Sequence, residues 1–177
     1  MHTRSEKELE RIGFRYAGRF RRLGTQHHAK EATVLALVGE LGAGKTTFLR
    51  GFARGLGIRK RVTSPTFVLA RRYKIPPRTM RRNAVGYNAK ISSDATAYSL
   101  RPTADYKWFW HFDCYRLHSV HDLEELGFRE IIRDPHALVA IEWADRIKNA
   151  LRKKTAWIEF SHHPKGRRVV IRRISNF

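Results

Sequence analysis

The segment Gly39-Glu-Leu-Gly-Ala-Gly-Lys-Thr46 matches the pattern G-x-x-x-x-G-K-[ST] at every defined position. Its glycines allow a tight turn whose backbone N–H groups point inward, where they can bind phosphate oxygens. A continuous apolar run, Thr33–Val38, precedes this turn, and a segment typical of a helix, Lys45–Leu56, follows it. The sequence therefore predicts a buried strand, a phosphate-binding P-loop and a helix in succession.

The P-loop also predicts how a nucleoside triphosphate would be bound. Lys45 would reach the β- and γ-phosphates, and the Thr46 hydroxyl would ligate magnesium, with Thr47 as a second candidate. The residues expected to contact the nucleotide are Glu40, Leu41, Gly42, Ala43, Gly44, Lys45, Thr46 and Thr47. The chain has no Asn-Lys-x-Asp signature for guanine, so the expected cofactors are ATP and Mg²⁺.

Two further predicted strands end in an acidic residue. Asp113 follows Trp108–Phe112, and Glu142 follows Leu138–Ile141. Ligands of an open parallel sheet lie at the carboxyl ends of its strands, so either acid could hold magnesium, and Glu142 could orient the attacking water. Strand-end acids can also be caps or surface ion pairs, but two of them in a P-loop chain favour a magnesium and water site.

The segment Thr63-Ser-Pro-Thr66 lies between the P-loop helix and the next predicted strand. A threonine in this part of a P-loop protein can respond to the γ-phosphate through the metal. The same residues also fit an ordinary Ser-Pro turn. Val62–Leu69 as a whole is predicted to be a turn that leads into a strand.

The remaining pattern predicts the rest of an α/β fold. Helices are expected at 5–23, 119–132 and 144–151, and alternating residues from Trp157 onward predict a C-terminal β-hairpin. We expect residues 1–177 to form a single P-loop NTPase-like domain, with a central, mostly parallel sheet flanked by helices.

A basic insertion is predicted at about residues 74–107. This stretch separates two predicted strands with weak periodicity, and structureless loops longer than about 12–15 residues are uncommon in compact domains. Between Arg71 and Lys90 there is no acidic residue. The basic residues of this interval are Arg71, Arg72, Lys74, Arg78, Arg81, Arg82 and Lys90.

The net charge of +20 points to an acidic partner. Such a surface attracts polyanions, including tRNA, or an acidic protein. A general bias toward basic residues in the source organism explains the charge equally well.

The single cysteine, Cys114, excludes an intramolecular disulfide and a Cys-rich zinc site. Because the apolar runs are far shorter than a membrane span, we expect a cytoplasmic protein outside the membrane.

Taken in order, the motifs resemble one family, the bacterial TsaE (YjeE) ATPases. The segments that carry the resemblance are Gly39–Thr47, Ser64–Phe67, His111–Leu117, Asp122–Phe128 and Ile141–Trp143. The resemblance implies a small α/β P-loop fold. It also implies an ATPase that supports formation of threonylcarbamoyladenosine in tRNA together with the TsaB–TsaD complex.

The same resemblance assigns roles to individual residues. Lys45 and Thr46 would bind phosphate and magnesium, and Thr66 would lie on the γ-phosphate side. Asp113 and Glu142 would be the acids of the magnesium and water site. Trp143 would lie close to the nucleotide, although its side chain could equally be part of the core. The family joins the strands on either side of residues 74–107 by a short hairpin, so this chain departs from the family there.

Three functions remain open from the sequence. The first is a slow ATPase that works by nucleotide-dependent assembly with its partners. The second is a P-loop kinase of a small metabolite, in which the Arg-rich insertion would form a lid. The third is a basic RNA-binding module with ATP as a structural ligand, in which Trp108 and Trp110 would add stacking contacts.

Overall fold

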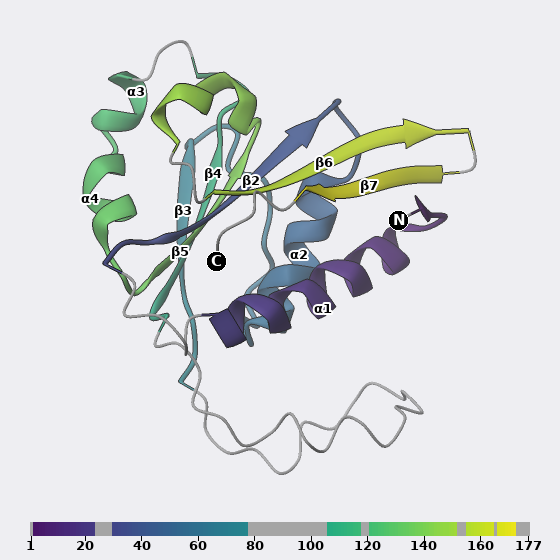
Figure 1. The fold of residues 1–177 in the computed structure, drawn as a ribbon, viewed down its shortest axis with the longest axis horizontal. Coiled ribbons are helices and arrows are strands. Elements are labelled where there is room, and N and C mark those ends of the chain that lie inside the picture. The colour runs from purple at the N-terminus through teal and green to yellow at the C-terminus, as the bar shows by residue number, and fades with distance from the viewer. Residues whose placement is uncertain are drawn as a thin grey trace.

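The computed structural model describes residues 2–23, 30–77, 106–117, 121–151, 155–164 and 166–172. Within them, a seven-stranded sheet has the order β1-β7-β6-β2-β5-β4-β3 (Figure 1). Its strands are β1 (His2–Thr3), β2 (Thr33–Gly39), β3 (Ala70–Lys74), β4 (Trp108–Asp113), β5 (Ala137–Glu142), β6 (Ala156–His163) and β7 (Gly166–Arg172). The helices are α1 (Glu6–Leu23), α2 (Lys45–Gly55), α3 (His121–Glu124), α4 (Phe128–Arg133) and the 3₁₀ helix η2 (Ala144–Ala150).

The centre of the sheet is parallel and its edges are antiparallel. Strands β6, β2, β5 and β4 pair in parallel. Strand β3 pairs antiparallel with β4, and β7 pairs antiparallel with β6 and β1. This arrangement confirms the predicted α/β class, the central parallel sheet and the C-terminal hairpin.

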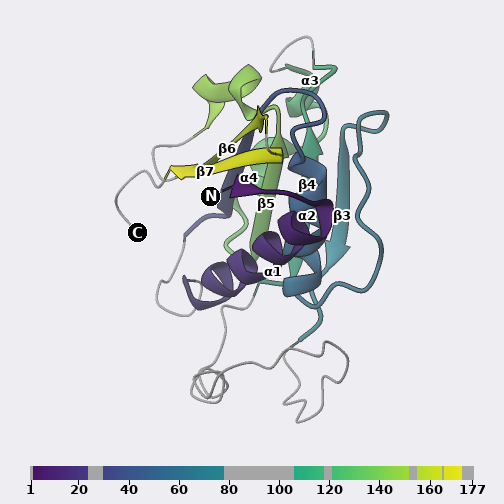
Figure 2. The same ribbon diagram turned by 90° about the vertical axis from the view of Figure 1, so that its right-hand side faces the viewer.

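Both faces of the central strands are buried, which explains the continuous apolar runs Val34–Val38 in β2 and Ala137–Ile141 in β5. Phe48 and Phe52 of α2 pack with α1 and with Leu35 and Leu37 of β2 on one face. On the other face, Phe128 of α4 packs in a second cluster, which contains Ala137, Val139 and Ile141 of β5. Figure 2, viewed from the side of α1 and α2, shows these two helices in front of the sheet.

Helices α1 and α2 approach closely through glycine. A Cβ atom added at Gly51 would lie 1.9 Å from the carbonyl oxygen of Glu10, and one at Gly13 would lie 2.1 Å from that of Phe48. Neither position has room for a side chain, because each neighbour is backbone. This contact fixes α1 against the helix that follows the P-loop.

Residues 119 and 120 of the helix predicted at 119–132 lie outside the described residues, and the remainder forms two short helices. Gly127 adopts φ 69° between α3 and α4, and its N–H donates to the Glu124 carbonyl. Helix α3 ends at Glu124, and the left-handed Gly127 directly precedes α4, so the prediction of a continuous helix was wrong. The segment predicted as a helix at 144–151 is the 3₁₀ helix η2.

The predicted turn at Val62–Leu69 is followed by a strand, β3, that begins only at Ala70. Leu69 has φ 58°, an uncommon conformation for a residue with a branched side chain. Most of the predicted insertion, residues 78–105, lies outside the described residues. Among the helices that the structure describes, none is long and apolar enough to cross a membrane.

Candidate functional site

The P-loop connects the end of β2 to the start of α2. Gly39, Gly42 and Gly44 have φ values of 134°, 75° and 102°, which glycine adopts without strain. A Cβ atom at Gly39 would also lie 2.0 Å from the Phe160 carbonyl oxygen. The first N–H groups of α2 therefore face the loop that precedes them, as in an anion-binding helix terminus.

Lys45 lies folded back over this loop. Its Nζ donates hydrogen bonds to the carbonyl oxygens of Gly39 at 2.6 Å and of Glu40 at 2.8 Å. The same Nζ lies 3.9 Å from the centre of the Trp143 ring. Burial lowers the pKa of Lys45, and the nearby carboxylates of Glu142 and Asp113 oppose this shift. The ammonium group is thus desolvated and positioned within reach of an anion at the P-loop.

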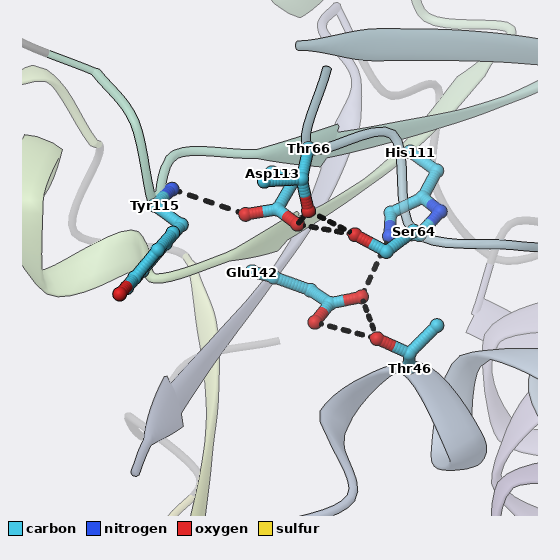
Figure 3. Close-up of polar contacts among 7 residues, drawn as sticks. All are labelled: Thr46, Ser64, Thr66, His111, Asp113, Tyr115 and Glu142. Carbon is cyan, nitrogen blue, oxygen red and sulfur yellow. Dashed lines mark hydrogen bonds and ion pairs between the residues drawn. The ribbon is translucent and has the colours of Figure 1, made fainter. Parts of the chain in front are cut away.

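Thr46 and Glu142 form a direct link between the P-loop helix and β5. The Thr46 hydroxyl lies 2.8 Å from Oε1 and 2.9 Å from Oε2 of Glu142 (Figure 3). The same Oε1 of Glu142 also accepts a hydrogen bond from His111 Nε2 at 2.8 Å. Both Glu142 and His111 are buried, so two donors hold the carboxylate in place.

Asp113 is the centre of a second group of contacts. Its Oδ2 accepts hydrogen bonds from the hydroxyls of Ser64 and Thr66, the latter at 2.5 Å. Its Oδ1 accepts a hydrogen bond from the backbone N–H of Tyr115 at 3.0 Å (Figure 3). The carboxylate therefore connects the Ser64–Thr66 turn to the loop that follows β4.

The sheet register brings these groups together. Asp113 lies opposite Glu142 in the parallel pair β4–β5, and Leu37 of β2 lies opposite Glu142 on the other side. The predicted residues Lys45, Thr46, Asp113 and Glu142 consequently gather at the carboxyl edge of the sheet. Thr66 lies at the same edge, where its hydroxyl donates a hydrogen bond to Asp113. Trp143 also lies there, with its ring against the Lys45 ammonium group.

The other residues predicted to contact the nucleotide lie in the P-loop and in the first turn of α2. Glu40 and Leu41 are exposed on the outer side of the P-loop. Thr47 is buried within α2, and it is the Thr46 hydroxyl that contacts Glu142. The sequence reasoning did not single out His111 or Ser64 as site residues. His111 was detectable because it precedes Asp113 by two positions and so shares its face of β4.

The side chains at this edge suit magnesium better than a transition metal. Thr46, Asp113 and Glu142 supply one hydroxyl and two carboxylates, which are the oxygen ligands that magnesium prefers. In the part of the chain that the structure describes, no group of three or more His, Cys, Asp or Glu side chains could hold a metal ion. A magnesium ion at this edge would take its remaining ligands from phosphate and water.

Cys114 lies between Asp113 and Tyr115, but its thiol is expected to be unreactive. Its side chain is buried, and burial raises the pKa of the thiol to about 12. A nucleophilic cysteine requires the thiolate, so this thiol is a core residue rather than part of the chemistry.

Comparisons with known proteins identify the family of this chain. The family model described as "Threonylcarbamoyl adenosine biosynthesis protein TsaE" matches residues 4–81 and 83–170. This chain belongs to the TsaE family. The match confirms the resemblance drawn from the motifs, and it covers the P-loop, both acids and most of the C-terminal hairpin.

Individual TsaE relatives align over most of the chain. The TsaE protein of Haemophilus influenzae is 26% identical over 155 residues, which cover 88% of this chain and 79% of the relative. The TsaE protein of Treponema pallidum is 31% identical over 141 residues, covering 80% and 82% respectively. A crystal structure of Bacillus subtilis YdiB aligns with a TM-score of 0.61 and 23% identity, over 99% of this chain and 84% of that one. The likeness to YdiB shows the shared fold.

Proposed function

We propose that this protein binds Mg²⁺-ATP and hydrolyses it slowly, in support of threonylcarbamoyladenosine modification of tRNA. In this proposal it acts in the cytoplasm through nucleotide-dependent assembly with a TsaB–TsaD-like complex. The observation that carries the proposal is the bridge from Thr46 to Glu142. It joins a P-loop hydroxyl to a buried strand-end carboxylate, the pair of groups that a magnesium triphosphate site requires.

Each residue then has a defined task. Lys45 would exchange its bonds to the Gly39 and Glu40 carbonyls for bonds to phosphate oxygens. Thr46 and Asp113 would hold magnesium, directly or through water, and the bound metal would neutralise charge on the phosphates. Glu142 would orient the attacking water, because His111 and Thr46 fix its carboxylate.

We expect slow turnover because the two arginines that the structure describes in the segments after β4 and β5 lie against aromatic rings. Arg116 lies 4.6 Å from the centre of the Phe67 ring, and Arg146 lies 5.5 Å from that of Tyr115. P-loop enzymes that lack a well-placed arginine finger turn over at roughly 10⁻⁴–10⁻² per second.

The test is ATP turnover of the full chain, measured with and without the TsaB–TsaD complex and tRNA. We expect the isolated protein to fall within the range of roughly 10⁻⁴–10⁻² per second and to accelerate with its partners. Lys45→Ala is the negative control, since it removes the cation that contacts phosphate. Turnover of the isolated protein on the order of 10 per second would contradict the proposal.

His111 is expected to act as a positioning residue for Glu142. His111→Leu removes the hydrogen bond to Oε1, so we expect turnover to fall roughly 10-fold with little change in nucleotide affinity. His111→Gln retains a donor near the same place and should recover part of the loss. Equal turnover in both variants would show that the hydrogen bond has no role beyond packing.

Family membership favours this proposal over the two alternatives. Both the kinase lid and the RNA-binding surface depended chiefly on the insertion, most of which lies outside the described residues. Phosphate transfer from ATP to a nucleoside or sugar, above the rate of transfer to water, would instead support the kinase.

A further inference from the structure

Two loops beside the candidate nucleotide site carry an unusually exposed apolar surface. Phe67 is 84% exposed and Val68 is 52% exposed, although both follow directly on the site residue Thr66. Arg116, which is also exposed, places its guanidinium carbon 4.6 Å from the centre of the Phe67 ring. We call Phe67, Val68 and Arg116 the Phe67–Arg116 surface. A large aromatic side chain this exposed is a feature of interaction sites when it lies in a patch.

The chain segments that carry this surface are basic in sequence. The segments 58–77 and 114–117 contain no Asp or Glu. The exposed basic residues that the structure places at these loops are Arg116, over the Phe67 ring, and Arg71, which donates a hydrogen bond to Thr63 Oγ1 at 3.0 Å. A partner that covers the Phe67–Arg116 surface would therefore be complementary in charge if it were acidic.

The site carboxylate Asp113 is hydrogen-bonded to both loops. Thr66, next to Phe67, donates to Asp113 Oδ2, and the N–H of Tyr115, next to Arg116, donates to Oδ1. The backbone N–H of Asp113 also donates to the carbonyl oxygen of Leu69 at 3.0 Å. Leu69 has φ 58°, so this loop is held in an uncommon conformation by contacts to the site. Any ligand that changes the contacts of Asp113 will act on both loops together.

We infer that the Phe67–Arg116 surface is a docking site for an acidic protein surface with an apolar pocket that accepts Phe67. Aromatic residues, phenylalanine included, and arginine are enriched at protein interfaces relative to the rest of the surface. Val68 favours a protein over RNA, because an aliphatic side chain offers a base no stacking surface. The inference deepens the proposed function and rests on it: it names the surface through which nucleotide-dependent assembly occurs.

The test compares two variants of the full chain, Phe67→Ala and Phe14→Ala. Phe14 is 55% exposed on α1 and serves as the matched control. Affinity for the TsaB–TsaD complex would be measured by calorimetry with Mg²⁺-ATP present, and nucleotide affinity with a fluorescent ATP analogue. We expect Phe67→Ala to weaken binding of the complex at least about 10-fold, because hot-spot residues contribute on this scale. Both variants should bind the nucleotide like the unmodified chain.

The outcomes separate this inference from the proposed function. If the unmodified chain binds the complex and Phe67→Ala binds it equally well, the docking site is wrong and the proposed function stands. If the unmodified chain fails to bind with and without ATP, assembly itself is refuted, and the docking site with it. If Phe67→Ala loses affinity for tRNA in a filter-binding assay but not for the complex, the surface serves RNA, which overturns the choice of a protein.

Discussion

Replacement of Glu142 by Gln is expected to slow ATP hydrolysis by about 100-fold or more, because positioned acid–base groups contribute on this scale. The amide keeps the size of the carboxylate but loses the charge that receives hydrogen bonds from Thr46 and His111. ATP should still bind, since Lys45 and the P-loop are unchanged. Single-turnover hydrolysis and equilibrium binding of a fluorescent ATP analogue would separate the two effects.

Glu125→Gln is the matched control for this prediction. Glu125 is an exposed carboxylate after α3, and no catalytic role is proposed for it. Its variant should hydrolyse ATP at the normal rate. If Glu142→Gln also retained normal turnover, Glu142 would not orient the attacking water, and Asp113 would be the remaining candidate for that role.

Replacement of Gly51 by Ala is expected to lower the free energy of unfolding by about 3 kcal/mol or more. The added Cβ would lie 1.9 Å from the Glu10 carbonyl oxygen, so α1 and α2 would have to separate. Urea unfolding followed by circular dichroism measures the change. The expected loss is large because the obstacle is backbone, which cannot rotate away.

Gly18→Ala provides the control, because it also changes a helical glycine. A Cβ atom at Gly18 would meet nothing within 4 Å. Alanine loses less backbone entropy than glycine in a helix, so this variant should be more stable by roughly 0.5–1 kcal/mol. If Gly51→Ala were as stable as Gly18→Ala, the close contact between α1 and α2 would not exist in solution.

Much of the fold follows from local sequence. The apolar run at Thr33–Val38 and the glycines after it specify β2 and the P-loop through contacts between near neighbours. The strand Trp108–Asp113 was predicted with its observed bounds. The prediction of one helix at 119–132 was wrong, because periodicity depends only on which residues are apolar. It does not show that Gly127 adopts a left-handed conformation.

Only part of the candidate site could be predicted from local sequence. Lys45 and Thr46 lie within one contiguous motif, so their roles could be predicted from residue order alone. Asp113 and Glu142 were predicted as strand-end acids, but their adjacency depends on β4 pairing with β5 in one register. His111 was missed as a site residue because its partner, Glu142, lies 31 residues away in sequence.

The sequence by itself determined the phosphate-binding loop, the family and the α/β class, because each depends on residues that are close together in the chain. Only the tertiary structure decided which side chains hold Glu142, how Asp113 links two loops, and that Phe67 stands exposed beside them. The physical reason is that these features depend on strand order and register. One position of slip would turn each side chain to the opposite face of the sheet.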